Sequence, residues 1–146
     1  MLLKYLSLLK LFLVLFFIFR LVAYSTSTPA GQAVQNILND LPGALAVAIV
    51  DISSGMTLAS HTNSSINPET AAAYNTEVVK QKQKAMQALK LQGENIEDIL
   101  ITLTNQLHLI KLVDDNKKFI YLVVNSRDTN LAIAREVLRS QNELLK

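Results

Sequence analysis

Residues 41–51 of the chain read LPGALAVAIVD, and this stretch decides the fold. Its apolar part, residues 44–50, is short and continuous, and it lies between a Pro-Gly pair and the turn-forming residues 51–55. A run of this kind is typical of a strand that is buried on both faces of a sheet. Gly55 stands where such a turn favours a positive φ angle. We therefore predict a central strand that turns back into a partner strand at residues 56–60.

A helix is predicted on the N-terminal side of this strand. Thr28 can accept hydrogen bonds from the free N–H groups of a helix start, and Pro29 suits the first helical turn. The Pro-Gly pair ends this helix. Its apolar positions follow at helical spacing and are Val34, Ile37, Leu38 and Leu41.

A long second helix is predicted over residues 69–91. Asn67 is suited to cap its start, Pro68 to form its first turn and Gly93 to end it. A stripe of apolar residues runs along this helix and consists of Ala71, Tyr74, Val78, Ala85 and Leu89.

Three strands and a helix complete the chain. Residues 98–104 alternate between apolar and polar side chains, as in a half-buried strand. Two further strands are expected at 107–113 and 119–124, on either side of a charged hairpin loop at 114–118. Asp128 is expected to cap the last helix, whose apolar face carries Leu131, Ala134, Leu138 and Leu145. The predicted order is α-β-β-α-β-β-β-α, which indicates a single domain of the α/β (α+β) class.

The N-terminal segment, residues 1–25, differs from this predicted domain, residues 26–146. It contains basic residues and no acidic one. Its uninterrupted apolar run, residues 11–19, is shorter than the about 20 residues of a membrane-spanning helix, and Lys10 would lie inside the bilayer. Three interpretations stay open: a secretory signal, an uncleaved anchor in contact with a membrane, and a mis-assigned translation start.

The composition of the remaining chain argues against several classes of function. Acidic and basic residues nearly balance outside the N-terminal segment, so we expect no nucleic-acid partner. Cysteine is absent, and His61 and His108 do not belong to a metal-ligand motif. The four glycines are dispersed, so no phosphate-binding loop is present. We therefore predict no catalytic, metal or cofactor-binding residue, and no cofactor.

The basic residues that remain are weak candidates for chemistry. Lys80 and Lys84 share one face of the second predicted helix and are expected to be solvated or to contact a partner. Arg127, in the loop before the last helix, and Arg135, within that helix, could only serve as arginine fingers supplied to a GTPase. A surface role is favoured for Arg135, and Arg127 is the better of two poor candidates.

Two stretches together resemble the roadblock/dynein-light-chain family. Residues 41–44, 48–51 and 55–56 resemble its first helix–strand–turn signature. Residues 119–124 and 130–135 are similar to the closing strand and helix of its bacterial members. The resemblance covers roughly residues 30–145. It implies a roadblock/profilin-like fold, in which a five-stranded antiparallel sheet is sandwiched by helices.

The resemblance also implies a class of function. Roadblock-type proteins usually bind no cofactor and catalyse nothing, but form homodimers and bind small GTPases, motor complexes or signalling scaffolds. We therefore expect a homodimeric regulator or adaptor of a small GTPase or related NTPase, working in the cytoplasm. An exported or membrane-tethered assembly module of the same fold is the alternative, because of residues 1–25. The expected dimer contacts lie on the third strand and second helix, at Val79, Met86, Ile99, Ile101 and Leu103, and partner contacts are expected at Lys80, Lys84 and Arg127.

Overall fold

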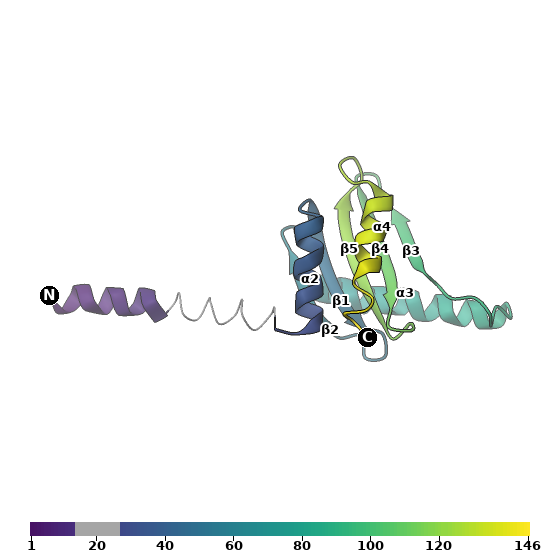
Figure 1. Ribbon diagram of the computed structural model, residues 1–146, viewed down its shortest axis with the longest axis horizontal. Helices are drawn as coiled ribbons and strands as arrows, with labels where there is room; N and C mark the ends of the chain where they lie inside the picture. Colours follow the sequence, from purple (N-terminus) through teal and green to yellow (C-terminus); the bar gives the residue numbers. More distant parts are fainter. Residues whose placement is uncertain (14–26) are drawn as a thin grey trace.

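The computed structural model describes residues 1–13 and 27–146. From residue 27 onward the chain forms a five-stranded antiparallel sheet with helices on both faces, as Figure 1 shows. The strand order is β2-β1-β5-β4-β3. The elements are α2 (Pro29–Asp40), β1 (Ala44–Asp51), β2 (Thr57–Thr62), α3 (Pro68–Ala88), β3 (Asp98–Thr102), β4 (Gln106–Val113), β5 (Lys118–Asn125) and α4 (Leu131–Ser140). The predicted order and fold class are confirmed.

Residues 2–13 form a separate helix at the N-terminus. The predicted boundary between residues 25 and 26 lies outside the described residues. Within the described part of the chain, no helix has the length and apolar character needed to cross a membrane.

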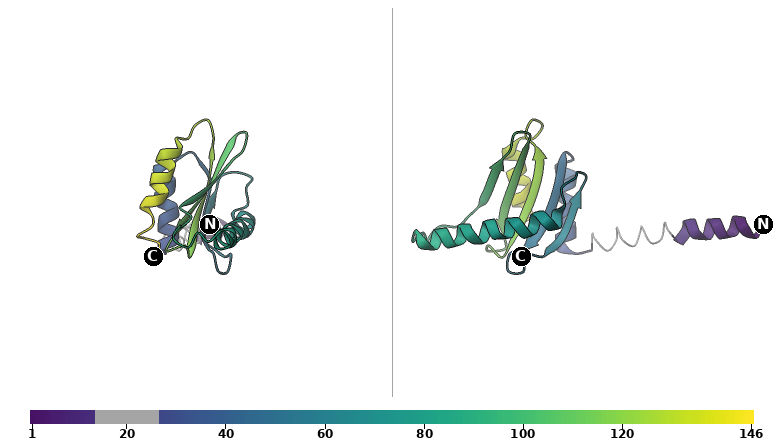
Figure 2. Two further views of the ribbon diagram at one scale, coloured as in Figure 1. Left: turned by 90° about the vertical axis from the view of Figure 1, so that its right-hand side faces the viewer. Right: turned by 180° about the vertical axis from the view of Figure 1, so that it is seen from behind.

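The centre of the sheet is the pair formed by β1 and β5. Val47 lies opposite Leu122 and Ala48 lies opposite Tyr121. Both strands are buried along nearly their whole length, as the apolar run at residues 44–50 predicts. Side chains alternate between the two faces, so each strand contributes to two separate cores. Figure 2 shows the resulting layers, with α2 and α4 on one face and α3 on the other.

The helices α2 and α4 begin at side-chain caps. The Thr28 hydroxyl accepts a hydrogen bond from Gly31 N at 3.0 Å, as predicted. The predicted cap of α4, Asp128, is wrong. Asn130 caps this helix instead, and its Oδ1 accepts hydrogen bonds from the backbone N–H groups of Ala132 and Ile133. Asp128 lies in the turn that carries the chain from β5 to α4.

The helix α3 faces the sheet with a different row of residues from the predicted stripe. Its buried residues are Pro68, Ala72, Thr76 and Val79. Of the predicted stripe, Ala71 and Val78 are half-buried and pack against the same core, whereas Tyr74 and Leu89 are exposed to solvent. The sheet beneath α3 carries the small side chains of Ala46 and Ala48 in the same core as Ala72. These small side chains leave room for the α3 backbone to lie close to the sheet.

The end of α3 also differs from the prediction. The helix stops at Ala88, and Lys90 adopts a left-handed φ of 57°. Leu91 N donates to Met86 O and Lys90 N donates to Gln87 O, which is the hydrogen-bond pattern of a Schellman cap. Gly93, predicted to end the helix, has no positive φ and lies beyond this cap. A lysine therefore occupies the position where glycine is usually found.

The turn between β1 and β2 is held by Asp51. Its Oδ2 accepts hydrogen bonds from Ser53 Oγ at 2.6 Å, Ser54 Oγ at 2.6 Å and Ser54 N at 2.8 Å. These bonds, with that of Ser53 foremost, lower the pKa of Asp51 to about 2. Gly55 follows at a φ of 71°, as the sequence predicts.

Replacing Gly55 by alanine should destabilise the domain. A Cβ at this position meets Thr76 only at 3.7 Å, so the cost comes from the left-handed backbone and amounts to about 1–2 kcal/mol. The matched control is Gly93→Ala, where a Cβ meets nothing within 4 Å; this change should leave stability unchanged or raise it by up to about 1 kcal/mol. Urea unfolding measures the free energy of unfolding of the two variants. Equal values would contradict the left-handed backbone at Gly55 as the source of the cost.

Candidate protein-interaction surface

The strand β3 lies at one edge of the sheet and pairs only with β4 among the described residues. An edge strand uses one side of its backbone in the sheet and leaves the other side available for pairing. β3 is short and carries Ile99 and Ile101, both half-buried. Leu103 follows in the hairpin and is 47% exposed. Backbone pairing groups and apolar side chains therefore occur together along this edge.

The C-terminal part of α3 extends past this edge, as the right view of Figure 2 shows. Beyond Val79 no residue of α3 is buried. We call residues 83–91 the α3 overhang. It carries Met86, which is half-buried, and Leu89 and Leu91, which are 70% and 42% exposed. Together with Ile99, Ile101 and Leu103, these residues make up what we call the β3–α3 surface.

The predicted dimer contact at Val79 needs correction. The Val79 side chain is fully buried in the core between α3 and the sheet. It belongs to the buried row of the helix, which the sequence stripe misplaced by one residue. Val78, its neighbour, is half-buried and packs against the same core. Val79 therefore supports the helix from below and is unavailable to a partner.

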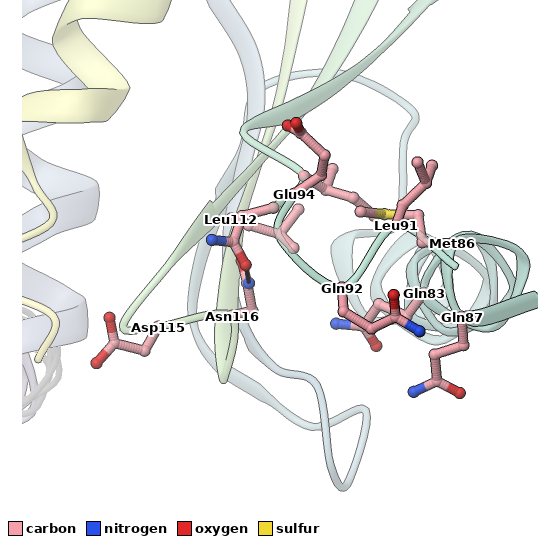
Figure 3. A pocket seen from close by; sticks show the side chains of 11 residues that line it. Gln83, Met86, Gln87, Leu91, Gln92, Glu94, Leu112, Asp115 and Asn116 are labelled. Carbon is pink, nitrogen blue, oxygen red and sulfur yellow. Dashed lines mark hydrogen bonds between the residues drawn. The ribbon is translucent and has the colours of Figure 1, made fainter. Parts of the chain in front are cut away.

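A cavity of about 530 Å³ lies beneath the α3 overhang, between it and the β4–β5 hairpin (Figure 3). Apolar side chains from three segments line it, among them Met86, Leu91 and Leu112. Amide side chains and the carboxylates of Glu94 and Asp115 line the rest. Asn116 Nδ2 donates a hydrogen bond to Asn95 Oδ1 at 3.2 Å. No cationic residue is among the lining residues. The cavity therefore lacks the positive charge needed to hold a phosphate and offers apolar, amide and carboxylate contacts instead.

A polar group lies on the α3 face of the sheet next to β3. Tyr121 Oη and His108 Nδ1 are 2.8 Å apart, and His108 Nε2 lies 3.0 Å from Gln106 Oε1. Asn75 of α3 also hydrogen-bonds Tyr121. Burial lowers the pKa of His108 and raises that of Tyr121. His108 pairs with Ile101 across β4 and β3, so this group borders the β3–α3 surface.

The sequence pattern missed this polar group. Tyr121 lies within an apolar strand, and a buried phenol usually requires a hydrogen-bond partner. That partner is His108, but the pairing of β4 with β5 is needed to bring the two residues together. The sequence alone therefore indicates that Tyr121 has a hydrogen-bond partner, but it does not identify that partner as His108.

The basic residues singled out from the sequence do not form one site. Lys80 Nζ lies 3.9 Å from Glu77 and 3.5 Å from Ser53 O, beside the β1–β2 turn. Lys84 is exposed one helical turn further along α3. Arg127 is exposed in the loop after β5. Because the β1–β2 turn and this loop lie at opposite ends of β5, Lys80 and Arg127 are separated by roughly 25 Å of strand.

Arg135 is held in an ion pair. Its Nε and Nη2 each lie 3.0 Å from a carboxylate oxygen of Asp98, which is a bidentate contact from α4 to the start of β3. This arrangement occupies the donors that an arginine finger would direct at phosphate. Among residues 1–13 and 27–146, no three acidic or histidine side chains come close enough to hold a metal ion.

The pKa of His108 predicts a pH dependence of stability. Because burial lowers this pKa in the folded state, the unfolded chain binds more protons just below its ordinary value of 6.5. The stabilising contribution is fully present above pH 6.5 and is lost as pH falls through the folded-state pKa. Urea unfolding at one protein concentration should give a free energy that falls between pH 7.5 and 5.5. His108→Gln should flatten this slope, while the exposed control His61→Gln should keep it; a slope that survives in His108→Gln would contradict the assignment.

The fold of this chain is similar to that of several solved structures. No protein-family model and no curated protein matches the sequence. Solved structures do match. MglB of Myxococcus xanthus is 20% identical, with a TM-score of 0.64, over 78% of this chain and 89% of that one. A roadblock/LC7 domain from Streptomyces avermitilis is 10% identical, with a TM-score of 0.66, over 77% of this chain and 90% of that one.

A third similar structure is MglB in a tetrameric arrangement. It is 20% identical, with a TM-score of 0.63, over 80% of this chain and 87% of that chain. At these identities the likeness concerns the fold, and it agrees with the sequence signatures at both ends of the domain. The segment from α2 to α4 therefore has the fold of roadblock/LC7 domains.

Proposed function

We propose that the protein is a non-catalytic homodimeric regulator or adaptor of a small GTPase or a related NTPase in a signalling complex. The β3–α3 surface is the observation that carries this proposal. It combines exposed leucines with a strand edge that pairs only with β4 in the part of the chain that the structure describes. It belongs to a domain whose fold is shared with MglB, which has been solved in a tetrameric arrangement.

The proposed dimer has two copies related by a two-fold axis, with their β3 strands paired antiparallel. Such pairing is self-complementary and satisfies the outward backbone groups of both edges. Each α3 overhang would then extend over the partner's half of the joined sheet. Met86 and Leu89 would contact the partner there, and Ile99, Ile101 and Leu103 would line the seam.

The proposed effect on a GTPase is indirect. Arg135 is engaged by Asp98, and Arg127 stands alone on a loop far from the other candidate contacts at Lys80 and Lys84. A protein that supplies no catalytic group can still regulate a GTPase, if it binds one nucleotide state of that GTPase more tightly than the other. A tenfold preference corresponds to about 1.4 kcal/mol of differential binding free energy.

The second candidate function is an exported or membrane-tethered assembly module. The helix at residues 2–13, whose large apolar side chains are exposed, favours it. If residues 1–25 direct export, the β3–α3 surface serves assembly alone, and a cytosolic GTPase is excluded as a partner. The position of the native N-terminus distinguishes the two functions.

The dimer can be tested at two sheet edges. Leu103→Asp should raise the dimer dissociation constant at least tenfold, because it places a charge in the seam. Leu58→Asp is a matched control, since Leu58 lies on the opposite edge strand β2 and is 45% exposed against 47% for Leu103. Sedimentation velocity at tens of micromolar protein measures the dimer dissociation constants of both variants. A monomeric wild-type protein, or equal effects of the two variants, would refute the proposed interface.

GTPase regulation can be tested by single-turnover hydrolysis. Small GTPases of the source organism are loaded with GDP or a GTP analogue and titrated with the protein; at least tenfold preference for one state is expected.

Arg127→Ala and Arg135→Ala should each reduce hydrolysis less than about tenfold, whereas a true finger supplies 10³–10⁵. Lys80→Glu with Lys84→Glu should abolish binding, and Lys82→Glu, on another face of α3, should not. A thousandfold loss from either arginine with binding intact would show that the protein supplies chemistry.

A further inference from the structure

The helix at residues 2–13 contains large apolar side chains that nothing in the described domain covers. Leu2, Leu3, Tyr5, Leu8 and Leu9 are between 58% and 84% exposed, and Leu6, at 46%, is the least exposed of the group. The domain itself exposes apolar side chains singly or along the β3–α3 surface. An apolar surface as continuous as that of residues 2–13 indicates a contact with another apolar phase.

The polar residues of this helix lie on one side. Lys4, Ser7 and Lys10 follow at intervals of three residues, so they occupy an arc of roughly 120° around the helix axis. The Ser7 hydroxyl donates to Lys4 O at 3.0 Å, so its hydrogen bond is made within the helix. The opposite arc, which includes Leu2, Tyr5, Leu6, Leu9 and Leu13, contains no polar residue except the tyrosine hydroxyl. Leu3 and Leu11 also lie within the arc of Lys4, Ser7 and Lys10. Both charges are therefore on one narrow side of the helix, which they share with two leucines.

The width of the apolar arc indicates which kind of surface the helix contacts, a second copy of itself or a lipid bilayer. A coiled coil with a second copy uses a narrow seam of two positions per heptad, whereas here apolar residues cover more than half of the helix circumference. A bilayer surface accepts a wide apolar face, which sinks to the boundary between headgroups and acyl chains.

The charge of the segment selects the type of bilayer. Residues 1–28 contain Lys4, Lys10 and Arg20 and no aspartate or glutamate. Basic residues near an anionic lipid surface contribute about 1 kcal/mol each, while a neutral surface offers them nothing comparable. Lys4 and Lys10 stand on the side of the helix that would face the phosphates.

We propose that residues 2–13 form an interfacial anchor that lies in the surface of an anionic phospholipid bilayer, with Lys4 and Lys10 at the lipid phosphates and the leucine-rich arc facing the acyl chains. This proposal does not depend on GTPase regulation. It gives the roadblock-type domain a location, since the domain would be held beside the membrane by its own N-terminus.

Vesicle flotation of the full-length protein tests the lipid preference. We expect the protein to bind vesicles of phosphatidylcholine with 30% phosphatidylglycerol at least tenfold more tightly than vesicles of phosphatidylcholine alone. Lys4→Glu with Lys10→Glu should remove this difference. The control, Lys82→Glu with Lys117→Glu, changes the net charge equally at two exposed sites of the domain and should keep it. Equal binding to both vesicles, or equal loss in both double variants, would overturn the proposal.

The depth of the helix tests its orientation. The chain contains no cysteine, so Leu2→Cys and Leu13→Cys each provide a unique labelling site. A fluorophore at either site should be quenched at the same shallow depth by brominated lipids. A helix that enters the bilayer along its axis would separate the two depths by roughly 16 Å, at 1.5 Å per residue, and would overturn the interfacial placement. Mass spectrometry of the native protein must also find residues 1–13 intact, and a mature start near Ser25 would overturn the proposal.

Discussion

The pairing of β1 with β5 is the constraint on which the rest of the domain depends. Both strands are buried on both faces, so each face of the sheet must be covered by helices before the backbone is shielded from water. Because these two strands occupy the centre, β2 and β3 are left at the edges. The β2 edge is in contact with both α2 and α3. The β3 edge is the one past which α3 continues without a sheet beneath it.

The elements were predictable where local chemistry alone decides them. Thr28, Asn67 and Gly55 act through hydrogen bonds or φ angles within a few residues, and the structure confirms all three. The errors occur where tertiary packing competes. The row of α3 that faces the sheet is set by the small residues of β1 beneath it, which hydrophobic periodicity in the helix cannot reveal. The same one-residue error placed Val79 on the surface.

The end of α3 illustrates a second limit of sequence reasoning. Glycine usually occupies the left-handed position after a helix, and Gly93 is close enough to suggest it. The chain instead places Lys90 in that conformation, so that Leu91 can turn back toward the cavity lined by Met86 and Leu112. The candidate surface was thus predictable as an edge strand, while the overhang that completes it depends on contacts across the fold.

The two proposed surfaces reinforce each other physically. The membrane affinity of an interfacial helix grows with its buried apolar area and its attraction to anionic lipids, so a second helix on the same particle strengthens the attachment. A dimer formed through β3 would carry two copies of residues 2–13, and once one is bound the second binds as an intramolecular event. Linked binding of this kind raises affinity by about 10²–10⁴ without any new contact. Self-association at the sheet edge would therefore control how long the domain stays at the membrane, and a partner that competes for β3 would release it.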